Sequence, residues 1–198
     1  ASLLMLSGNR DQLQTAINDL QSVVSRMPDN PVLRFNLGRA HLAKGNVQQA
    51  RIQFEEAIKL RQDYLLPRIA LAQILQQNGE FGRVVQMSGE ILAYDPSNLQ
   101  AKLLRTRALI GMGETKQARQ ELSDMKQSNP DVWEAKLQLA ALDMNEKNYR
   151  AAEDTFRKMY TETGDPRALM GLTETYTTQA HYDQAMQVLQ DEVKKHPE

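Results

Sequence analysis

Residues 33–58 read LRFNLGRAHLAKGNVQQARIQFEEAI, and this stretch decides the fold. Its apolar residues recur at intervals of roughly three or four residues on both sides of Gly45-Asn46, a pair typical of turns. The apolar positions are Leu33, Leu37, Ala40 and Leu42 before the turn, and Val47, Ala50, Phe54, Ala57 and Ile58 after it. The stretch therefore predicts two amphipathic helices joined by a short turn.

The same arrangement returns along the chain with a period of 34 residues. Three series keep this spacing or a multiple of it: Gly45, Gly79 and Gly113; Pro28, Pro96 and Pro130; and Ala50, Ala118 and Ala152, with Val84 at the missing place. A fixed period of about 34 residues is typical of helix-turn-helix solenoids. We therefore predict an all-α fold, a right-handed α-α superhelix (solenoid) of about six repeats.

The repeats predict pairs of helices throughout the chain. The expected helices cover residues 11–27, 31–44, 47–61, 65–78, 81–94, 98–112, 115–128, 131–146, 149–162, 166–179 and 182–196, with residues 2–7 as the stub of one more. The repeats lie at about 1–30, 31–64, 65–98, 99–132, 133–165 and 166–198. We expect a single array over 1–198 that is a segment of a longer protein. Asp29, Ser97 and Asp165 are the predicted N-caps.

Composition and charge exclude several classes of protein. The 24 Lys and Arg residues balance 25 Asp and Glu residues, so no global field attracts a nucleic acid or an anionic membrane. The absence of Cys excludes disulfides and thiolate metal sites. No apolar run reaches the roughly 18 to 20 residues of a membrane span. The start of the chain does not read as a secretory signal, and the location stays open: cytoplasmic or, if a signal was removed, periplasmic.

The run Leu37-Gly38, Gly45, Ala50, Phe54 and Ala57 resembles the tetratricopeptide repeat (TPR) of the bacterial type. The pattern of that family has these residue types at these spacings and ends on a Pro, which is Gln62 here. The resemblance covers nearly the whole chain. It implies that the two helices of a repeat cross closely at Gly38 and Ala50, where a larger side chain would overpack the crossing.

Two repeats depart from the pattern. Arg105-Thr106 stand where the family has Leu-Gly, so that helix pair should pack differently. The helix expected at 81–94 contains Gly82 and Gly89, each costing roughly 1 kcal/mol relative to Ala in a helix interior. We predict a soft joint in this helix; the alternative is neutral drift in a tolerant solenoid.

No motif predicts catalysis or metal binding. Gly111-Met112-Gly113 follows a predicted helix and lacks the Gly-Lys-Ser/Thr ending of a phosphate loop, so it reads as a turn. His41, His181 and His196 lie in different repeats without the spacing of a metal site. We therefore predict a protein that is not an enzyme and has no cofactor or metal.

The resemblance places function on a surface, because in this family the first helices of successive repeats line a concave groove that holds a peptide or a partner helix. The implied groove residues are Phe35, Asn36, Arg39, Leu42, Ile69, Gln73, Gln76, Leu103, Arg107, Ile110, Leu137 and Met144, with Met170 continuing the series. We hypothesise a ligand that inserts apolar side chains and offers a carboxylate to Arg39 or Arg107. The alternative is that the apolar residues pack between neighbouring first helices and the arginines are solvated.

The expected function is a non-catalytic protein-protein interaction scaffold. Its partner would be a protein or peptide, without nucleic acid or a membrane span. Two alternatives stay open: an accessory TPR module of a larger enzyme or of a secretion or assembly protein, and an RNA-binding helical repeat, which the neutral charge and few aromatics disfavour. Ala185, Leu189 and Val193 on the last helix are candidates for end-to-end self-association.

Overall fold

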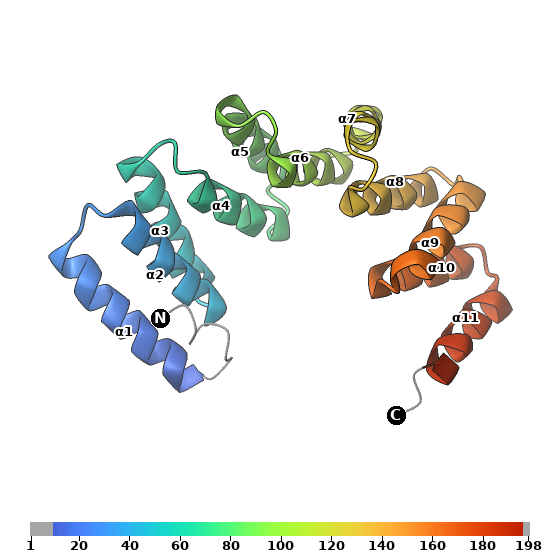
Figure 1. Ribbon diagram of the computed structural model, residues 1–198, viewed down its shortest axis with the longest axis horizontal. Coiled ribbons are helices and arrows are strands. Elements are labelled where there is room, and N and C mark those ends of the chain that lie inside the picture. Colours follow the sequence, from blue (N-terminus) through green and yellow to red (C-terminus); the bar gives the residue numbers. More distant parts are fainter. Residues whose placement is uncertain (1–9, 196–198) are drawn as a thin grey trace. The chain divides into compact units, whose positions relative to one another are not determined.

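The computed structural model describes residues 10–195, which form eleven α-helices and no strand (Figure 1). The helices are α1 (Arg10–Arg26), α2 (Pro31–Ala43), α3 (Val47–Leu60), α4 (Leu65–Gln77), α5 (Phe81–Tyr94), α6 (Leu99–Gly111), α7 (Thr115–Ser128), α8 (Trp133–Asn145), α9 (Tyr149–Thr163), α10 (Pro166–Thr178) and α11 (Tyr182–Lys195). The all-α prediction is confirmed, with every predicted boundary within about two residues, the usual uncertainty of helix ends. The stub expected at residues 2–7 lies outside the described residues.

The chain divides into two compact units at the turn between α6 and α7. Unit 1 is residues 1–112, with helices α1–α6, and unit 2 is residues 113–198, with helices α7–α11. Within each unit every helix packs against the next one in sequence, and α4 also packs on α6 and α8 on α10. Such nearest-neighbour packing is that of a helical solenoid. Between residues 10 and 195, no helix is both long and apolar enough to cross a membrane.

The turn inside each repeat is held by one residue in the left-handed conformation. Gly45, Gly79 and Gly113 have φ of 86°, 75° and 81°. A Cβ at any of them would meet no atom within 4 Å, so the glycines are there for their backbone conformation and not for space. The next two repeats keep this conformation without glycine, at Lys147 (φ 65°) and Ala180 (φ 59°). The left-handed turn residue therefore recurs in the later repeats although it is no longer glycine.

The close crossing of α2 and α3 is confirmed. A Cβ on Gly38 would stand 2.5 Å from Cε1 of Phe54 and 3.2 Å from the Ala50 carbonyl oxygen. Phe54 is fully buried, and its ring packs against Phe35 at a centroid distance of 5.7 Å. In unit 2 a Cβ on Gly171 would likewise stand 2.5 Å from Cε1 of the Phe156 ring. Large rings packed over glycines therefore bring neighbouring helices together in both units.

The two departures from the repeat pattern take different forms. Thr106 is fully buried, and its hydroxyl donates to the Leu103 carbonyl at 3.1 Å, which satisfies the polar group inside α6. Helix α5 runs unbroken through Gly82 and Gly89. Ser88 is fully buried in α5, and its hydroxyl has no hydrogen-bond partner among residues 10–195. The soft joint in α5 stays a prediction, supported by this poorly matched buried position.

The N-caps were predicted one residue too early in two cases. Asp165 caps α10, accepting from the Arg167 backbone N–H at 2.8 Å, as predicted. The cap of α2 is Asn30 in place of Asp29, and the cap of α6 is Asn98 in place of Ser97. Both asparagine side chains accept backbone N–H groups from the first turn of their helix.

Candidate peptide-binding surface

The predicted groove residues of unit 1 occupy equivalent positions on α2, α4 and α6. The first groove position is the fifth residue of each helix: Phe35, Ile69 or Leu103. Phe35 and Ile69 are only 9% and 7% exposed, and Leu103 is half-buried. Phe35 packs edge-on against Tyr64 at a centroid distance of 5.5 Å. Phe35 and Ile69 therefore belong to the core of unit 1 and lie beneath the surface, whereas Leu103 is only partly covered.

The positions four and seven residues further along each helix, and Asn36 directly after Phe35, are less buried. Arg39, Gln73 and Arg107 are exposed, and Asn36, Leu42, Gln76 and Ile110 are half-buried. Residues spaced by three or four lie on one side of a helix, so each helix adds a polar position beside an apolar or amide one. We call this set the α2–α4–α6 face: Asn36, Arg39, Leu42, Gln73, Gln76, Arg107 and Ile110.

Arg39 and Arg107 have no carboxylate partner at ion-pair distance among the described residues. Other arginines of unit 1 do: Arg51 pairs with Glu55 at 3.0 Å, and Arg83 pairs with Glu80 at 2.6 Å. The Arg39 guanidinium lies 5.8 Å from the centroid of the Phe35 ring, a cation-π contact that does not consume its N–H donors. The α2–α4–α6 face therefore has positive charge that the described part of the chain does not neutralise.

Gln76 adds an acceptor to this face. Its side-chain oxygen is buried and has no hydrogen-bond partner within residues 10–195. Buried polar atoms in folded proteins are almost always hydrogen-bonded, to protein or to water. Because this oxygen is buried, a ligand on the α2–α4–α6 face can reach it only after the Gln76 side chain rotates.

The predicted groove residues of unit 2 form a surface of different chemistry. Leu137 and Met144 on α8 are half-buried, while Met170 on α10 is 70% exposed. Met170 lines a pocket of about 320 Å³ together with Leu169, Thr173, Glu174, Thr177 and Leu189. The position equivalent to Arg107 is Ala141 on α8 and Glu174 on α10, so this unit offers no arginine there.

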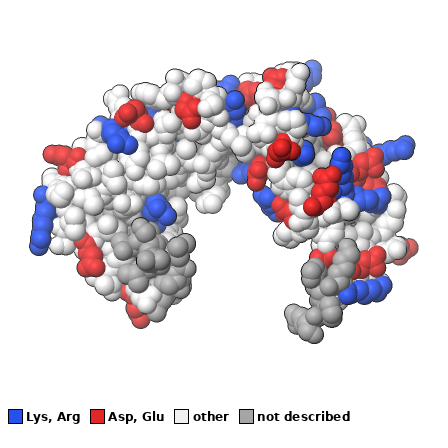
Figure 2. Space-filling model, viewed as in Figure 1, with Lys and Arg blue, Asp and Glu red and all other residues white. Residues whose placement is uncertain are grey.

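The distribution of charge also differs between the units. On the face drawn in Figure 2, the surface of unit 1 is mostly uncharged, whereas acidic and basic side chains lie intermixed over unit 2. Neither unit shows an extended patch of one sign in this view.

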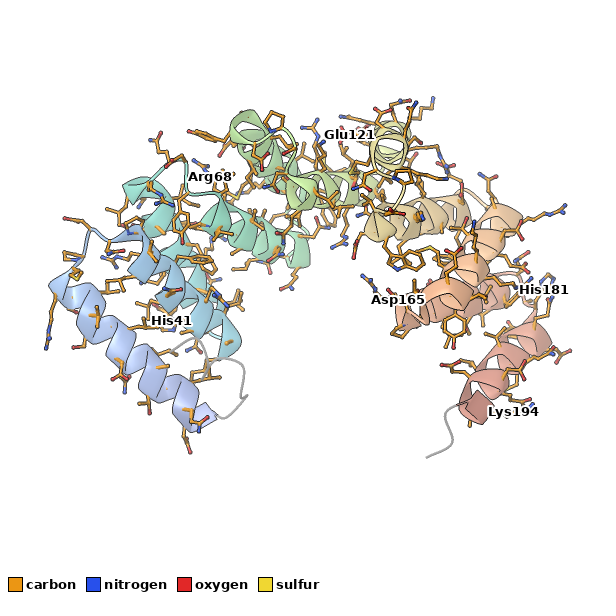
Figure 3. The ribbon with its side chains drawn as sticks, viewed as in Figure 1. His41, Arg68, Glu121, Asp165, His181 and Lys194 are labelled. Carbon is orange, nitrogen blue, oxygen red and sulfur yellow. The ribbon has the colours of Figure 1, made fainter. Side chains whose placement is uncertain are left out.

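The histidines do not assemble a site. His41 is buried on α2 (Figure 3), and burial, assisted by the charge of Lys44, lowers its pKa below the usual value of 6.5. Its Nδ1 has no hydrogen-bond partner in the described part of the chain. His181 is exposed in unit 2, and His196 lies outside the described residues. Within residues 10–195, no cluster of His, Cys, Asp and Glu could hold a metal ion.

The sequence did not predict the polar network at the start of α10. One carboxylate oxygen of Asp165 accepts from the Trp133 indole N–H at 3.0 Å and from Nη2 of Arg167 at 2.6 Å, beside its capping bond (Figure 3). Hydrogen bonds from the Arg167 side chain and backbone, and then from Trp133, hold the pKa of Asp165 well below its usual value. Trp133 is therefore a structural residue that connects two repeats. Trp133 and Asp165 are 32 residues apart, close to one repeat length, and this spacing was the signal in the sequence that the two residues could lie side by side.

Comparisons with known proteins agree with the geometry. The family model of the tetratricopeptide repeat matches residues 10–74 and again 75–142. No curated protein matches this sequence. Similar solved structures include a tetratricopeptide repeat protein from Parabacteroides merdae, 20% identical with a TM-score of 0.84, which covers all of this chain and 80% of its own.

Two further structures show the same fold at similar distance. A thermophilic TPR protein of Thermus thermophilus is 19% identical with a TM-score of 0.72 over 85% of this chain and 92% of its own. The TPR protein YrrB is 14% identical with a TM-score of 0.61 over 90% of this chain and 93% of its own. The repeats of this family generally serve as non-catalytic modules that bind proteins or peptides. The 34-residue period, the turns with positive φ and the family match over residues 10–142 together show that this chain belongs to the tetratricopeptide repeat family, a protein-interaction repeat scaffold.

Proposed function

We propose that the α2–α4–α6 face binds a peptide segment of a partner protein in which an acidic residue lies near apolar residues. The observation that carries this proposal is the pair Arg39 and Arg107, which are exposed and have no carboxylate partner in the described part of the chain. A guanidinium can hold a carboxylate through two parallel hydrogen bonds, which fixes both position and orientation.

The neighbouring residues supply the remaining contacts. Leu42 and Ile110 are half-buried and can cover apolar side chains of the ligand. The Gln76 side chain, whose oxygen is buried without a partner, can rotate to accept a backbone N–H of the ligand. Peptide as the ligand class agrees with the description of YrrB as a TPR protein with an unusual peptide-binding site.

The test is the selection of ligands from an arrayed library of short peptides. The wild-type chain should select sequences in which Asp or Glu is spaced by a few residues from Leu, Ile or Phe. The Arg39→Glu/Arg107→Glu variant should lose this selection, because each reversal replaces an attraction by a repulsion. A matched control is Arg26→Glu/Lys59→Glu, which changes the net charge equally at exposed positions of α1 and α3.

Two results would count against the proposal. One is a selected consensus without acidic residues. The other is equal loss of binding in the control and in the groove variant, which would show that only the net charge matters. Circular dichroism of all variants verifies that the helices are retained.

A further inference from the structure

Repeats at 31–64 and 65–98 share an arginine that locks the first helix to the second. It is the fourth residue of the first helix: Arg34 on α2 and Arg68 on α4. In both, Nε donates at 3.1 Å to the carbonyl six residues earlier, that of Pro28 or Gln62. The tenth residue of the second helix is acidic in both repeats, Glu56 or Glu90. Only Glu90 pairs with the arginine of its repeat; Arg34 donates instead to Gln53 of α3 at 3.2 Å, and Glu56 pairs with Lys59.

The pair in the second of these repeats shows how the lock works. Arg68 is 9% exposed and forms a salt bridge through Nη1 with Glu90 of α5 (Figure 3). The planar guanidinium thus contacts the preceding loop and the following helix at once.

The repeat at 133–165 lacks the acidic member of this pair. Its equivalent positions are Lys136, the fourth residue of α8, and Lys158, the tenth residue of α9. Two like charges replace an ion pair, so the side chains cannot close the space between the helices. In agreement, a cleft of about 830 Å³ lies here, lined by residues of α7, α8 and α9, all within unit 2.

The floor and rim of this cleft have distinct chemistry. Leu139 of α8 and Met159 of α9 contribute apolar surface, and Lys126, Lys136 and Lys158 contribute ammonium groups. Lys126 and Lys136 have no carboxylate at ion-pair distance within residues 113–195, whereas Lys158 lies 3.9 Å from Glu162. The cleft thus has two lysines without a carboxylate partner, where the repeat at 65–98 has the ion pair of Arg68 with Glu90.

The acidic side chains that line the cleft do not cancel this charge. Asp143 accepts from Arg119 at 2.8 Å, and Arg119 also binds Glu146 at 2.7 Å. Glu162 is the partner of Lys158. Asp154 is the remaining lining carboxylate, against the two unpaired lysines.

We propose that this cleft, defined by Lys126, Lys136, Leu139, Lys158 and Met159, binds an acidic segment of a partner protein. A Glu or Asp of that segment takes the place between Lys136 and Lys158 that Glu90 takes beside Arg68. An apolar neighbour in the segment packs on Leu139 and Met159. This site is independent of the α2–α4–α6 face, since it belongs to the other unit and uses a different row of residues on α8.

The experiment measures fluorescence anisotropy with a labelled synthetic peptide in which Glu and Leu alternate. All proteins carry Arg39→Glu and Arg107→Glu, so that binding on unit 1 does not contribute. The decisive variant is Lys158→Glu, which restores the acid–base pair seen between Arg68 and Glu90 and thereby fills the site from within. We expect its peptide affinity to fall by roughly threefold to tenfold, since the Lys158 side chain is 75% exposed and solvent partly screens the reversed charge.

The matched control is Lys116→Glu, the same charge change at an exposed residue of α7 outside the cleft. Its affinity should change by less than about twofold, as expected for a remote screened charge. Lys136→Gln, which removes a charge without adding one, should also weaken binding, and urea unfolding of both cleft variants checks that they fold.

Equal weakening by Lys116→Glu and Lys158→Glu would overturn the proposal, as would binding that Lys158→Glu leaves unchanged. Inorganic phosphate serves as the competing small anion. If phosphate at low millimolar concentration displaces the peptide completely, the cleft is a small-anion site and the proposed peptide segment is wrong. Retained binding of the alternating peptide over its Gln-for-Glu counterpart in phosphate supports the proposal.

Discussion

The crossing of α2 and α3 offers a sharp test of how this solenoid is held together. Gly38→Ala adds one methyl group to α2, where its carbon would stand 2.5 Å and 2.7 Å from two atoms of the Phe54 ring. The ring cannot move aside freely, because it is fully buried and packs against Phe35. We therefore expect a loss of stability although Ala is the better helix former.

The magnitude follows from two opposing effects. Replacing Gly by Ala in a helix interior stabilises by about 1 kcal/mol. Overpacking a well-filled core costs about 1 to 3 kcal/mol. The expected net change for Gly38→Ala is thus a loss of stability of up to about 2 kcal/mol.

Gly89→Ala in α5 is the reference variant, because it adds the same methyl group without overpacking. A Cβ there would meet its nearest neighbour, Nη1 of Arg105, at an ordinary distance of 3.7 Å. This variant should gain the propensity of about 1 kcal/mol without a steric cost. The difference between the two variants then measures the overpacking alone, about 1 to 3 kcal/mol.

The assay is urea unfolding followed by circular dichroism. Gly38→Ala at least as stable as Gly89→Ala would refute the reasoning. A double-mutant cycle adds a second check: Phe54→Leu should be less destabilising when Gly38→Ala is present, with a coupling of at least about 0.5 kcal/mol. No coupling would show that the added methyl group does not contact the ring.

Three further predictions concern single residues. Burial lowers the pKa of His41 below 6.5, so the unfolded chain binds a proton at this residue more readily than the folded chain. The contribution of His41 to stability should therefore be full above pH 6.5 and decline below it, by no more than about 1.4 kcal/mol per pH unit. Urea midpoints between pH 7.5 and about 5.5 check this, and His41→Gln should flatten the profile. Asp165→Ala should lower the urea midpoint more than Asp165→Asn, because only the former removes the acceptor of the Trp133 indole and of the α10 cap; equal midpoints would contradict the network. Lys147→Gly should stabilise unit 2 by about 0.5 to 1 kcal/mol, since Lys147 has φ of 65°, and an unchanged midpoint would contradict the strain assigned to this turn.

The helices and their order could be predicted from the sequence because the information is local. Apolar spacing of three or four residues marks a helix that buries one side, and the glycines at 45, 79 and 113 mark the turns between helices. Gly38 beside Phe54 could be predicted as a close crossing for the same reason: a single repeat contains both residues.

Features that depend on several helices could not be predicted from one sequence. Phe35, Ile69 and Arg39 all belong to the expected groove series, yet two are buried and one is exposed, because burial depends on which helix packs above each position. The repeat spacing predicts turns at Lys147 and Ala180, but these residue types do not indicate the left-handed conformation that both adopt and do not favour.

The sequence by itself therefore determined a tetratricopeptide solenoid. The residues that recur with the period of 34, the turn glycines and the small residues at the helix crossing, make their contacts within a single repeat. Only the tertiary structure decided which arginines lack carboxylate partners among the described residues and where a cleft opens between α7 and α9. The physical reason is that both are properties of side chains from different helices. The replacement of an acid by Lys158 matters only because packing brings that position and Lys136 into the lining of one cleft.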